Sequence, residues 1–428
     1  MVYNKVMEMI LDLPKELIEL AELLKPKGEL FVVGGFIRNS LLGIKSNDID
    51  ICSSILCEDV CEILKDTKFK AKEKSKKLGT LSIQDDKGNV YEYATFRKEV
   101  YEANSGKHFP ISVEWTTDIR EDAKRRDFTM NCIYYSILKK NVVDIYSGVY
   151  DIQKRIIRCV ETPNFVFQSD GQRILRMIRF ACELNFKFDR STFVMAKKMS
   201  YRLKDISGPK KYEELKNILN SPYKYPLAKK DAFIKGLNLF NSFSIWSSYG
   251  IGAGKIKLNM VKKVDRRLRF MALLVDIIDT VNPDCVDYYL SHLLGNDNFM
   301  MNSRYMNTII NVICGYYDAL NQLDNKEYFT KYFDNFMDIG YLLQNVSRRL
   351  FNKYIFFYRY ITNHKLAITT KDLKITVQDI KKHFPRIEEK KYKKILNSLL
   401  SKVFEGELEN KTEALLKEIK DGINSGSY

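Results

Sequence analysis

The chain has 428 residues, 45% of them hydrophobic, and carries 70 lysines and arginines against 54 acidic residues, a net charge of +16. This length predicts two to four domains with real cores, and no apolar run reaches the roughly 18 residues that a membrane helix needs. The excess of positive charge favours a polyanionic partner, of which nucleic acid is the commonest.

The N-terminal part mixes helices and strands. Apolar residues at helical spacing predict an amphipathic helix within 1–24, and ELFVV at 29–33 predicts a buried strand that leads into two glycines. A short helix at 36–43 ends at Gly43, a residue that suits a helix C-cap. Alternation and turn residues predict a hairpin turn at 86–89 and further strands at 48–53, 79–84, 90–96 and 142–145. We expect an antiparallel or mixed sheet.

From residue 167 onward the periodicity is almost entirely helical. Helices are predicted at 172–184, 192–202, 209–220, 257–280, 284–294, 303–323, 326–362 and, in pieces, 376–420. The sequence shows no low-complexity linker and no internal repeat. An α/β head followed by an all-helical remainder is the simplest account.

Residues 33–51, VGGFIRNSLLGIKSNDIDI, combine a turn, a cation and two carboxylates. In a strand Asp48 and Asp50 would project from one face, where they repel each other unless a cation lies between them, and Mg²⁺ is the natural one. A glycine pair after a strand lets a phosphate approach the main chain at Gly35, and Arg38 can reach the same anion. The segment therefore suits a nucleoside triphosphate aligned for attack on its α-phosphate with two metal ions.

These residues resemble the G-G-x-x-R…D-x-D signature of the class II tRNA nucleotidyltransferases, the CCA-adding enzymes, whose relatives are the bacterial poly(A) polymerases. The family's usual motif has aspartate directly after the arginine, where this chain has Asn39. We expect that position to support the turn. Thr95 to Glu99 resemble the family's T-F-R-x-E stretch, and residues 101–120 take the place of its flexible loop.

Further motifs extend the resemblance. RRDFTMN is similar to the family's R-R-D-F-T-x-N motif, which implies that Arg125, Arg126 and Asp127 contact the nucleotide. Asp144, Gly148 and Asp151 resemble a hinge between head and neck. Residues 375–416 resemble a tail that grips the tRNA elbow, with Glu407 and Asn410 in place.

The stretch SDGQRILRMIRF, 169–180, offers a physical basis for choosing a base. Asp170 and Arg173 lie three residues apart on a predicted helix and share a face. Cytosine and adenine each present an amine donor beside a ring-nitrogen acceptor, so a carboxylate and a guanidinium together suffice to read them. The family's motif here is usually E-D-x-x-R, with Ser169 replacing the glutamate in this chain. By resemblance, Arg176 and Arg179 contact the nucleotide's phosphates.

The resemblance implies an α+β fold, with a polymerase-β-like nucleotidyltransferase head and an all-helical neck, body and tail. The expected limits are 1–147 for the head, 148–225 for the neck, 226–345 for the body and 346–428 for the tRNA-binding tail. The implied activity is addition of CCA to the 3′ end of tRNA from CTP and ATP, with Asp48 and Asp50 as catalytic residues that bind Mg²⁺. We expect a cytoplasmic enzyme that contacts the 3′ end and elbow of tRNA and has no membrane or DNA partner.

Three alternatives stay open. The chain could be a poly(A) polymerase or an enzyme that adds only CC or only A. It could be an RNA-binding relative without catalysis, although the retained carboxylate pair argues against that. A small-molecule nucleotidyltransferase would not need the long basic helical half.

Cysteine and histidine give no sign of a metal centre. Cys52, Cys57 and Cys61 lie close together at a spacing that fits no zinc pattern, so reduced buried thiols are expected. The chain has four histidines, none followed by aspartate, which argues against a histidine-built metal site and an attached phosphohydrolase domain. The basic runs at 68–77, 255–269 and 381–394 are either solvated faces or contacts to RNA phosphates.

Overall fold

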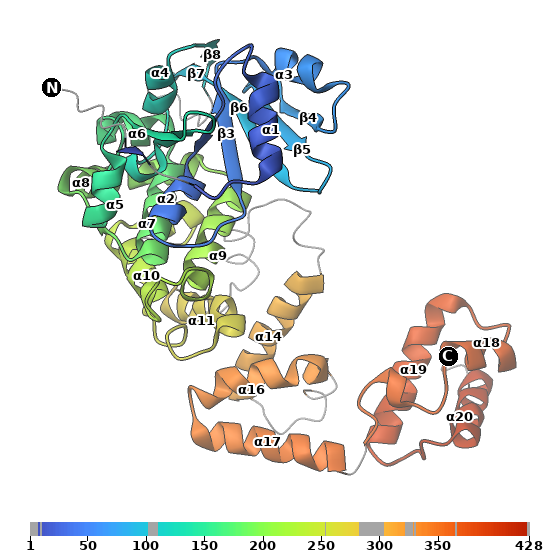
Figure 1. The fold of residues 1–428 in the computed structure, drawn as a ribbon. Helices are drawn as coiled ribbons and strands as arrows, with labels where there is room; N and C mark the ends of the chain where they lie inside the picture. Colours follow the sequence, from blue (N-terminus) through green and yellow to red (C-terminus); the bar gives the residue numbers. More distant parts are fainter. Residues whose placement is uncertain are drawn as a thin grey trace. The chain divides into compact units, whose positions relative to one another are not determined.

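A computed structural model describes residues 7–8, 11–101, 110–252, 254–281, 304–321, 328, 331–363 and 366–425 (Figure 1). The chain divides into two compact units. The first comprises Met1–Leu258 and Ile277–Asn298, and the second Asn259–Asp276 and Phe299–Tyr428. None of the described helices is both long enough and apolar enough to cross a membrane.

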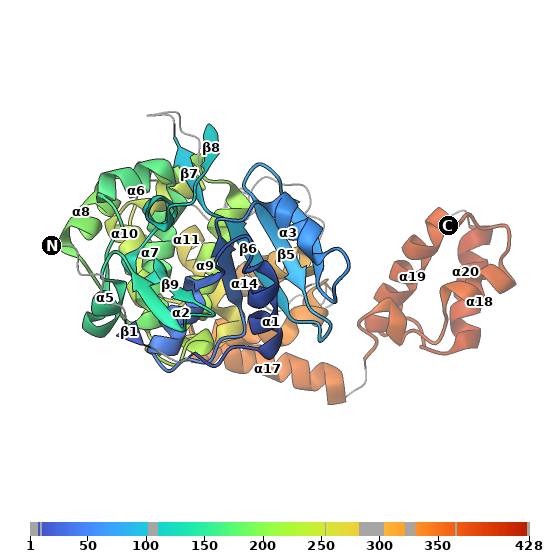
Figure 2. The ribbon, with the colours of Figure 1, turned by 45° about the horizontal axis from the view of Figure 1, so that its top comes forward.

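An eight-stranded mixed sheet forms the centre of the N-terminal part of the first unit. Its strands run in the order β1 (Met7–Glu8), β10 (Asn141–Asp144), β9 (Ile133–Ser136), β2 (Phe31–Val33), β3 (Ile49–Ser53), β6 (Val90–Thr95), β5 (Thr80–Gln84) and β4 (Lys70–Ser75). The pair β3–β6 is parallel and the other neighbouring pairs are antiparallel, which confirms the expected mixed sheet. A separate antiparallel hairpin, β7 (Arg97–Val100) with β8 (Ser112–Trp115), projects beyond this sheet (Figure 2).

Short helices accompany the sheet. They are α1 (Lys15–Leu24), α2 (Gly35–Leu41), α3 (Cys57–Leu64), α4 (Ile119–Lys124) and the 3-10 turn η1 (Thr129–Asn131). The prediction of one helix within 1–24 is partly wrong, because Met7–Glu8 is a strand and the helix starts only after Pro14. The helix at 36–43 is confirmed, and Gly43 follows its end at φ +70°, a conformation that glycine adopts readily.

The chain then becomes helical, as the periodicity predicts. The elements are α5 (Gly148–Lys154), the parallel strand pair β11 (Ile156–Ile157) and β12 (Lys187–Phe188), α6 (Pro163–Ser169), α7 (Gln172–Leu184), α8 (Arg190–Lys198), η2 (Ser200–Asp205), α9 (Gly208–Lys224), α10 (Ala232–Ser242) and η3 (Ile245–Tyr249). Helix α7 packs against α9 and α10 and contributes a largely buried apolar face. Its bounds coincide with the predicted 172–184.

The second unit is helical wherever it is described. Its elements are η4 (Arg266–Leu268), α11 (Arg269–Val281, which continues into the first unit), α14 (Arg304–Asn321), η5 (Phe333–Asn335), α16 (Phe336–Gln344), α17 (Arg348–Asn363), η6 (Thr370–Asp372), α18 (Val377–His383), α19 (Glu389–Phe404) and α20 (Thr412–Asn424). Helix α16 packs against α14 and α17. The last helices share an apolar core that includes Ile380, Ile395 and Leu415.

Two helix predictions in this part are wrong in extent. A single helix over 257–280 does not form, because residues 257–268 make loops and a 3-10 turn before α11 begins. The predicted 326–362 helix is interrupted between α16 and α17. The predicted helix at 284–294 lies outside the described residues.

Gly148 is held against the main chain of η1. A methyl group added at Gly148 would lie 2.2 Å from the carbonyl oxygen of Thr129, and the amide of Gly148 donates to Asp144 Oδ1 at 2.7 Å. Asp151, on the same short helix, accepts a hydrogen bond from the Thr129 hydroxyl at 2.8 Å. These contacts fix α5 to the strand and turn that precede it.

We therefore expect Gly148→Ala to lower the free energy of unfolding by about 1–3 kcal/mol, since a side chain here must displace backbone. Denaturant unfolding of the purified variant measures this. Gly252→Ala is the matched control, because an added methyl group there meets nothing within 4 Å. Equal stability of the two variants would contradict the tight contact.

Candidate active site

One cavity of about 470 Å³ in the first unit brings the predicted site residues together. All eleven residues singled out in the sequence line it: Gly35, Arg38, Asp48, Asp50, Arg125, Arg126, Asp127, Asp170, Arg173, Arg176 and Arg179. They come from the sheet, from α2, from the loops that follow α4 and α6, and from α7. Gly34 of the glycine pair and Asn131 of the RRDFTMN motif line it too, as do Gln172, Phe180 and Tyr225, for which sequence reasoning gave no site role.

Asp48 and Asp50 form the carboxylate pair. Asp48 directly precedes β3 and Asp50 lies within it, while the intervening Ile49 is buried. Partial burial, and then the charge of Asp48, raise the pKa of Asp50 above its usual value. A divalent cation would relieve both effects, so these two residues are the ones that could hold it. Among the described residues no third acidic, histidine or cysteine side chain completes a metal cluster, so further ligands would come from water and substrate.

The glycine pair forms a bare turn beside these carboxylates. Gly34 has φ +81°, which disfavours any residue with a side chain. A methyl group placed there would lie 3.6 Å from Asp50 Oδ2, and one on Gly35 would lie 3.6 Å from Arg38 Nη2. Without those methyl groups, an anion can approach the main chain between Asp50 and Arg38.

Arg38 is buried and is held by neutral side chains. Its Nε and Nη2 donate to Asn39 Oδ1 at 3.1 and 2.9 Å, and its Nη1 donates to Asn131 Oδ1 at 2.6 Å. The expectation that Asn39 supports the turn is therefore incomplete, because its side chain holds the arginine. Burial lowers the pKa of Arg38.

Asp122 organises the two arginines of the RRD motif. Its carboxylate accepts from Arg125 Nε at 2.8 Å, from Arg126 Nη2 at 3.1 Å and from the Tyr134 hydroxyl at 2.8 Å. The side chain is fully buried. Sequence reasoning missed Asp122, although its spacing of three and four residues from these arginines on a helix predicts the contacts.

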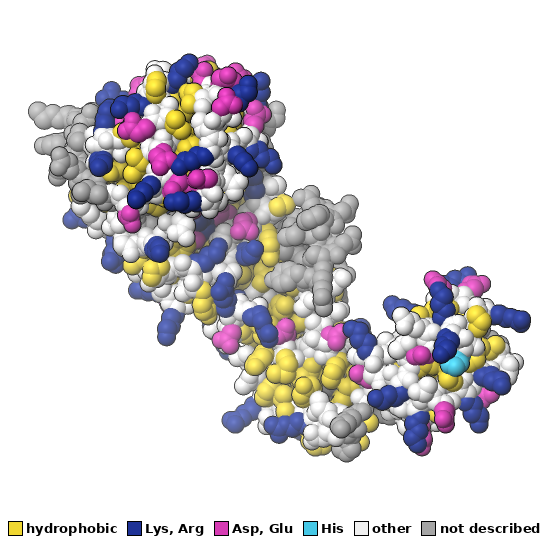
Figure 3. All heavy atoms as spheres, turned by 45° about the vertical axis from the view of Figure 1, so that its right-hand side comes forward, with side chains coloured by type: hydrophobic (Ala, Val, Ile, Leu, Met, Phe, Trp, Pro, Cys, Tyr) yellow, Lys and Arg dark blue, Asp and Glu magenta, His cyan; other side chains and the backbone are white. Residues whose placement is uncertain are grey.

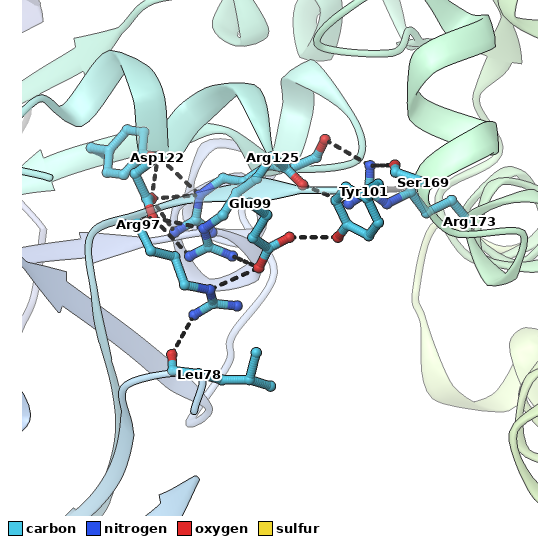
Figure 4. Close-up of polar contacts among 10 residues, drawn as sticks. Leu78, Arg97, Glu99, Tyr101, Asp122, Arg125, Ser169 and Arg173 are labelled. Carbon is cyan, nitrogen blue, oxygen red and sulfur yellow. Dashed lines mark hydrogen bonds and ion pairs between the residues drawn. The ribbon is translucent and has the colours of Figure 1, made fainter. Parts of the chain in front are cut away.

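A second acidic residue, Glu99, joins this cluster from the β7–β8 hairpin (Figure 4). It accepts from Arg97 Nε at 2.7 Å and from the Tyr101 hydroxyl at 2.5 Å, and it lies 3.9 Å from Arg125 Nη1. Tyr101 is the last described residue before 102–109, so most of the proposed loop at 101–120 either lies outside the described residues or forms β8 and the start of α4.

Asp127 joins the head to α7. Its Oδ2 lies 2.7 Å from Arg176 Nη2, and its Oδ1 accepts from Asn131 Nδ2 at 3.2 Å. Although burial alone would raise it, the charges of Arg176 and Arg173 lower the pKa of Asp127 to about 2. Arg179, which is also on α7, forms ion pairs with two acidic residues, Glu183 at 3.2 Å and Glu214 at 2.8 Å.

Asp170 and Arg173 both reach the cavity, but not from one helix as predicted. Asp170 lies between α6 and α7, where its Oδ1 accepts from the amide of Gln172 at 2.8 Å. Arg173 Nη2 donates to the carbonyl of Arg125 at 2.6 Å, and its Nη1 donates to Ser169 Oγ at 3.1 Å (Figure 4). Ser169 therefore orients Arg173, and Arg173 holds the RRD segment against α7.

The lowered pKa values of Asp122 and Asp127 predict that the folded protein loses stability in acid. Opposing the effect of burial, neighbouring arginines lower the pKa of each carboxyl to about 2 from an ordinary 3.8. The folded protein therefore binds fewer protons than the unfolded chain in this range, so stability falls as the pH drops from about 4 to 2, by roughly 2 kcal/mol per group.

Urea unfolding at pH 5 and pH 3 measures this loss. Asp122→Asn should be less stable than the parent at pH 5 and lose less on acidification, whereas the exposed Asp66→Asn should follow the parent. An unchanged acid loss in Asp122→Asn would contradict the assignment.

Comparison with known proteins finds similar sequences and similar folds. Residues 30–158 match the poly A polymerase head domain. The chain is 32% identical over 257 residues to the CCA-adding enzyme of Ligilactobacillus salivarius, covering 56% of this chain and 62% of that protein. It is 33% identical over 210 residues to the CCA-adding enzyme of Streptococcus mutans, covering 49% and 50%. The matched region thus spans less than two thirds of either relative.

Solved structures share the fold over nearly the whole chain. The crystal structure of the Bacillus stearothermophilus CCA-adding enzyme in complex with CTP aligns with a TM-score of 0.66 and 20% identity, covering 96% of this chain and 98% of that one. The Thermotoga maritima CCA-adding enzyme complexed with tRNA aligns with a TM-score of 0.60 and 21% identity, covering 96% of each. The chain therefore carries a poly A polymerase head domain, is similar in sequence over about half of its length to proteins named CCA-adding enzymes, and shares the fold of solved CCA-adding enzymes.

Proposed function

We propose that this protein adds CCA to the 3′ end of tRNA from CTP and ATP and releases pyrophosphate. The observation that carries the proposal is the single cavity that gathers two carboxylates, a glycine turn, six arginines and the Asp170–Arg173 pair. The similarity to proteins named CCA-adding enzymes, one of them crystallised with CTP and one with tRNA, supports the same activity.

Asp48 and Asp50 hold Mg²⁺ in this proposal. The donor set fits, since two exposed carboxylates beside a bare glycine turn leave room for water and phosphate oxygens. The ion would supply charge stabilisation for transfer at the α-phosphate and a more acidic 3′-hydroxyl. The protein's own part is to orient the triphosphate with the main chain at Gly34 and Gly35 and with the guanidinium groups around the cavity.

The base is read by Asp170 with Arg173. The half-buried carboxylate of Asp170 is available to accept an exocyclic amine hydrogen. Both terminal nitrogens of Arg173 already donate to oxygens of the protein, so a base would pair with its Nε–H, pair with the second N–H of Nη2, or replace one of those bonds. Guanine and uracil present the reversed pattern and leave these groups mispaired, at roughly 1–3 kcal/mol each.

The helical C-terminal half would contact the body of the tRNA. In Figure 3, lysine and arginine side chains are spread over the C-terminal helices with acidic ones among them. Asn410, which resembles a residue of the tRNA-binding tail, holds the local fold, accepting from the amide of Lys374 at 2.8 Å and donating to the carbonyl of Asp372 at 2.9 Å. The division into head, neck, body and tail and a cytoplasmic location belong to this same proposal.

The proposed reaction is tested with purified protein, Mg²⁺ and three tRNA transcripts that end at the discriminator base, after C and after CC. Each transcript is offered CTP, ATP or both, and the added length is read on a sequencing gel. We expect growth to a complete CCA end only when the missing nucleotides are supplied. Long adenosine tails would identify a poly(A) polymerase, and a stop after CC or activity on the CC-ended transcript alone would identify a partial enzyme.

Asp50→Asn is the catalytic control in that assay. It should lower transfer with CTP and with ATP by about a hundredfold or more, because the metal loses a charged ligand. Binding of tRNA, measured by filter retention, should persist.

Base choice is tested with Asp170→Asn. The amide presents a donor as well as an acceptor, so incorporation of UTP and GTP relative to CTP and ATP should rise about tenfold or more. The readout is kcat/KM for each nucleotide on the same transcript. The exposed Asp231→Asn, which does not line the cavity, is the matched control. Unchanged selectivity in Asp170→Asn would refute the reading role.

A further inference from the structure

Among the described residues, three guanidinium groups lie around one aromatic ring in the wall of the cavity. The guanidinium carbons of Arg38, Arg176 and Arg179 are 5.1, 5.3 and 4.4 Å from the centre of the ring of Phe180. Arg38 belongs to α2, whereas Arg176 and Arg179 belong to α7, so the ring contacts cations from two separate elements. Phe180 lines the same cavity and has only 4% of its surface exposed.

The polar partners of these three arginines differ. Arg38 donates to two side-chain amide oxygens. Arg176 pairs with Asp127, and Arg179 pairs with carboxylates of α7 and α9. Within the described part of the chain, the ring of Phe180 is the one contact that all three guanidinium groups have in common. The polar contacts therefore anchor each group separately, and the ring is what can hold them next to one another.

An aromatic ring is suited to hold several cations in one place. Like charges this close repel each other, and the negative face of a ring attracts a cation, most strongly where water is excluded. The ring also adds no ionised acceptor that would compete with a ligand's phosphates for the N–H groups of the arginines. An edge-to-face contact with Phe128, at 6.0 Å between ring centres, restricts the orientation of Phe180.

We propose that Phe180 is a positioning residue whose ring holds the guanidinium groups of Arg38, Arg176 and Arg179 in one cluster for the phosphate chain of the incoming nucleotide. The inference rests on the proposed function, in which guanidinium groups around the cavity orient the triphosphate, and it assigns the ring a role within it. Without the ring, mutual repulsion would spread the three groups apart, and the binding of a polyanion would have to bring them together again.

Fluorination of Phe180 tests the proposal because it weakens the negative face of the ring with little change in its shape. The parent is compared with proteins whose phenylalanine at this position carries one, two or three fluorine atoms, introduced by suppression of an amber codon. The Kd of inorganic pyrophosphate, from calorimetric titration, should rise stepwise by about twofold for each fluorine. The same series at Phe186, which is also buried but does not line the cavity, should leave this Kd unchanged.

Steady-state kinetics separate positioning from catalysis. Across the series at Phe180, the KM for CTP and for ATP should rise in step with the Kd of pyrophosphate, while kcat and the choice of base stay near the parent values. Phe180→Leu, which keeps an apolar side chain but removes the ring, should raise the Kd about tenfold. In an Arg38→Gln background that increase should be smaller, because one of the three cations is missing.

A Kd that stays near the parent value across the series at Phe180 would overturn the proposal, as would an equal rise in the series at Phe186. The fluorinated proteins decide even if Phe180→Leu does not fold, since their rings fill nearly the same space. Pyrophosphate binding is measured without tRNA, so a parent protein that binds it yet extends no transcript would refute CCA addition and leave the role of Phe180 intact. A parent protein that binds no pyrophosphate would overturn the proposal itself.

Discussion

The structure of the site depends on the repulsion among like charges gathered around one cavity. Six arginines and four aspartates line it, and groups of the same sign this close together are stable only if each has a partner. Several of the arginines have their partners outside the cavity lining. These carboxylates are Asp122, Glu183 and Glu214.

The same pairing joins the parts of the first unit. Asp127 belongs to the segment before η1 and Arg176 to α7, so their ion pair connects the sheet region to the helices that follow it. Arg173 makes a second connection through the carbonyl of Arg125. The edge-to-face contact of Phe128 with Phe180, at 6.0 Å between ring centres, adds an apolar one. Arg173, which we propose as a reader of the base, therefore also holds α7 to the segment that carries Arg125.

Local patterns in the sequence pointed to residues that the structure brings to one cavity, because the motifs are short and the geometry of each is set by one turn or one helix. The glycine pair, the D-I-D and the α7 arginines all reach the cavity as expected. The missed residues act across long stretches of sequence. Glu99 meets Arg125, and Glu214 meets Arg179, only after folding, and no spacing in the sequence predicts either contact. The expectation for Asn39 was incomplete, because its carbonyl accepts from the turn at Leu42 and Ile44 while its side chain also accepts from Arg38.

The run KFKAKEKSKK, which sequence alone left as either a solvated face or an RNA contact, includes strand β4 at one edge of the eight-stranded sheet. An edge strand exposes unpaired backbone groups, and alternating lysines keep a second chain from adding to it. Lys74 also crosses to Glu92 at 2.5 Å, and β4 carries a register shift between Glu73 and Ser75. The lysine side chains along β4 are therefore placed where they oppose the addition of a second chain to this edge of the sheet.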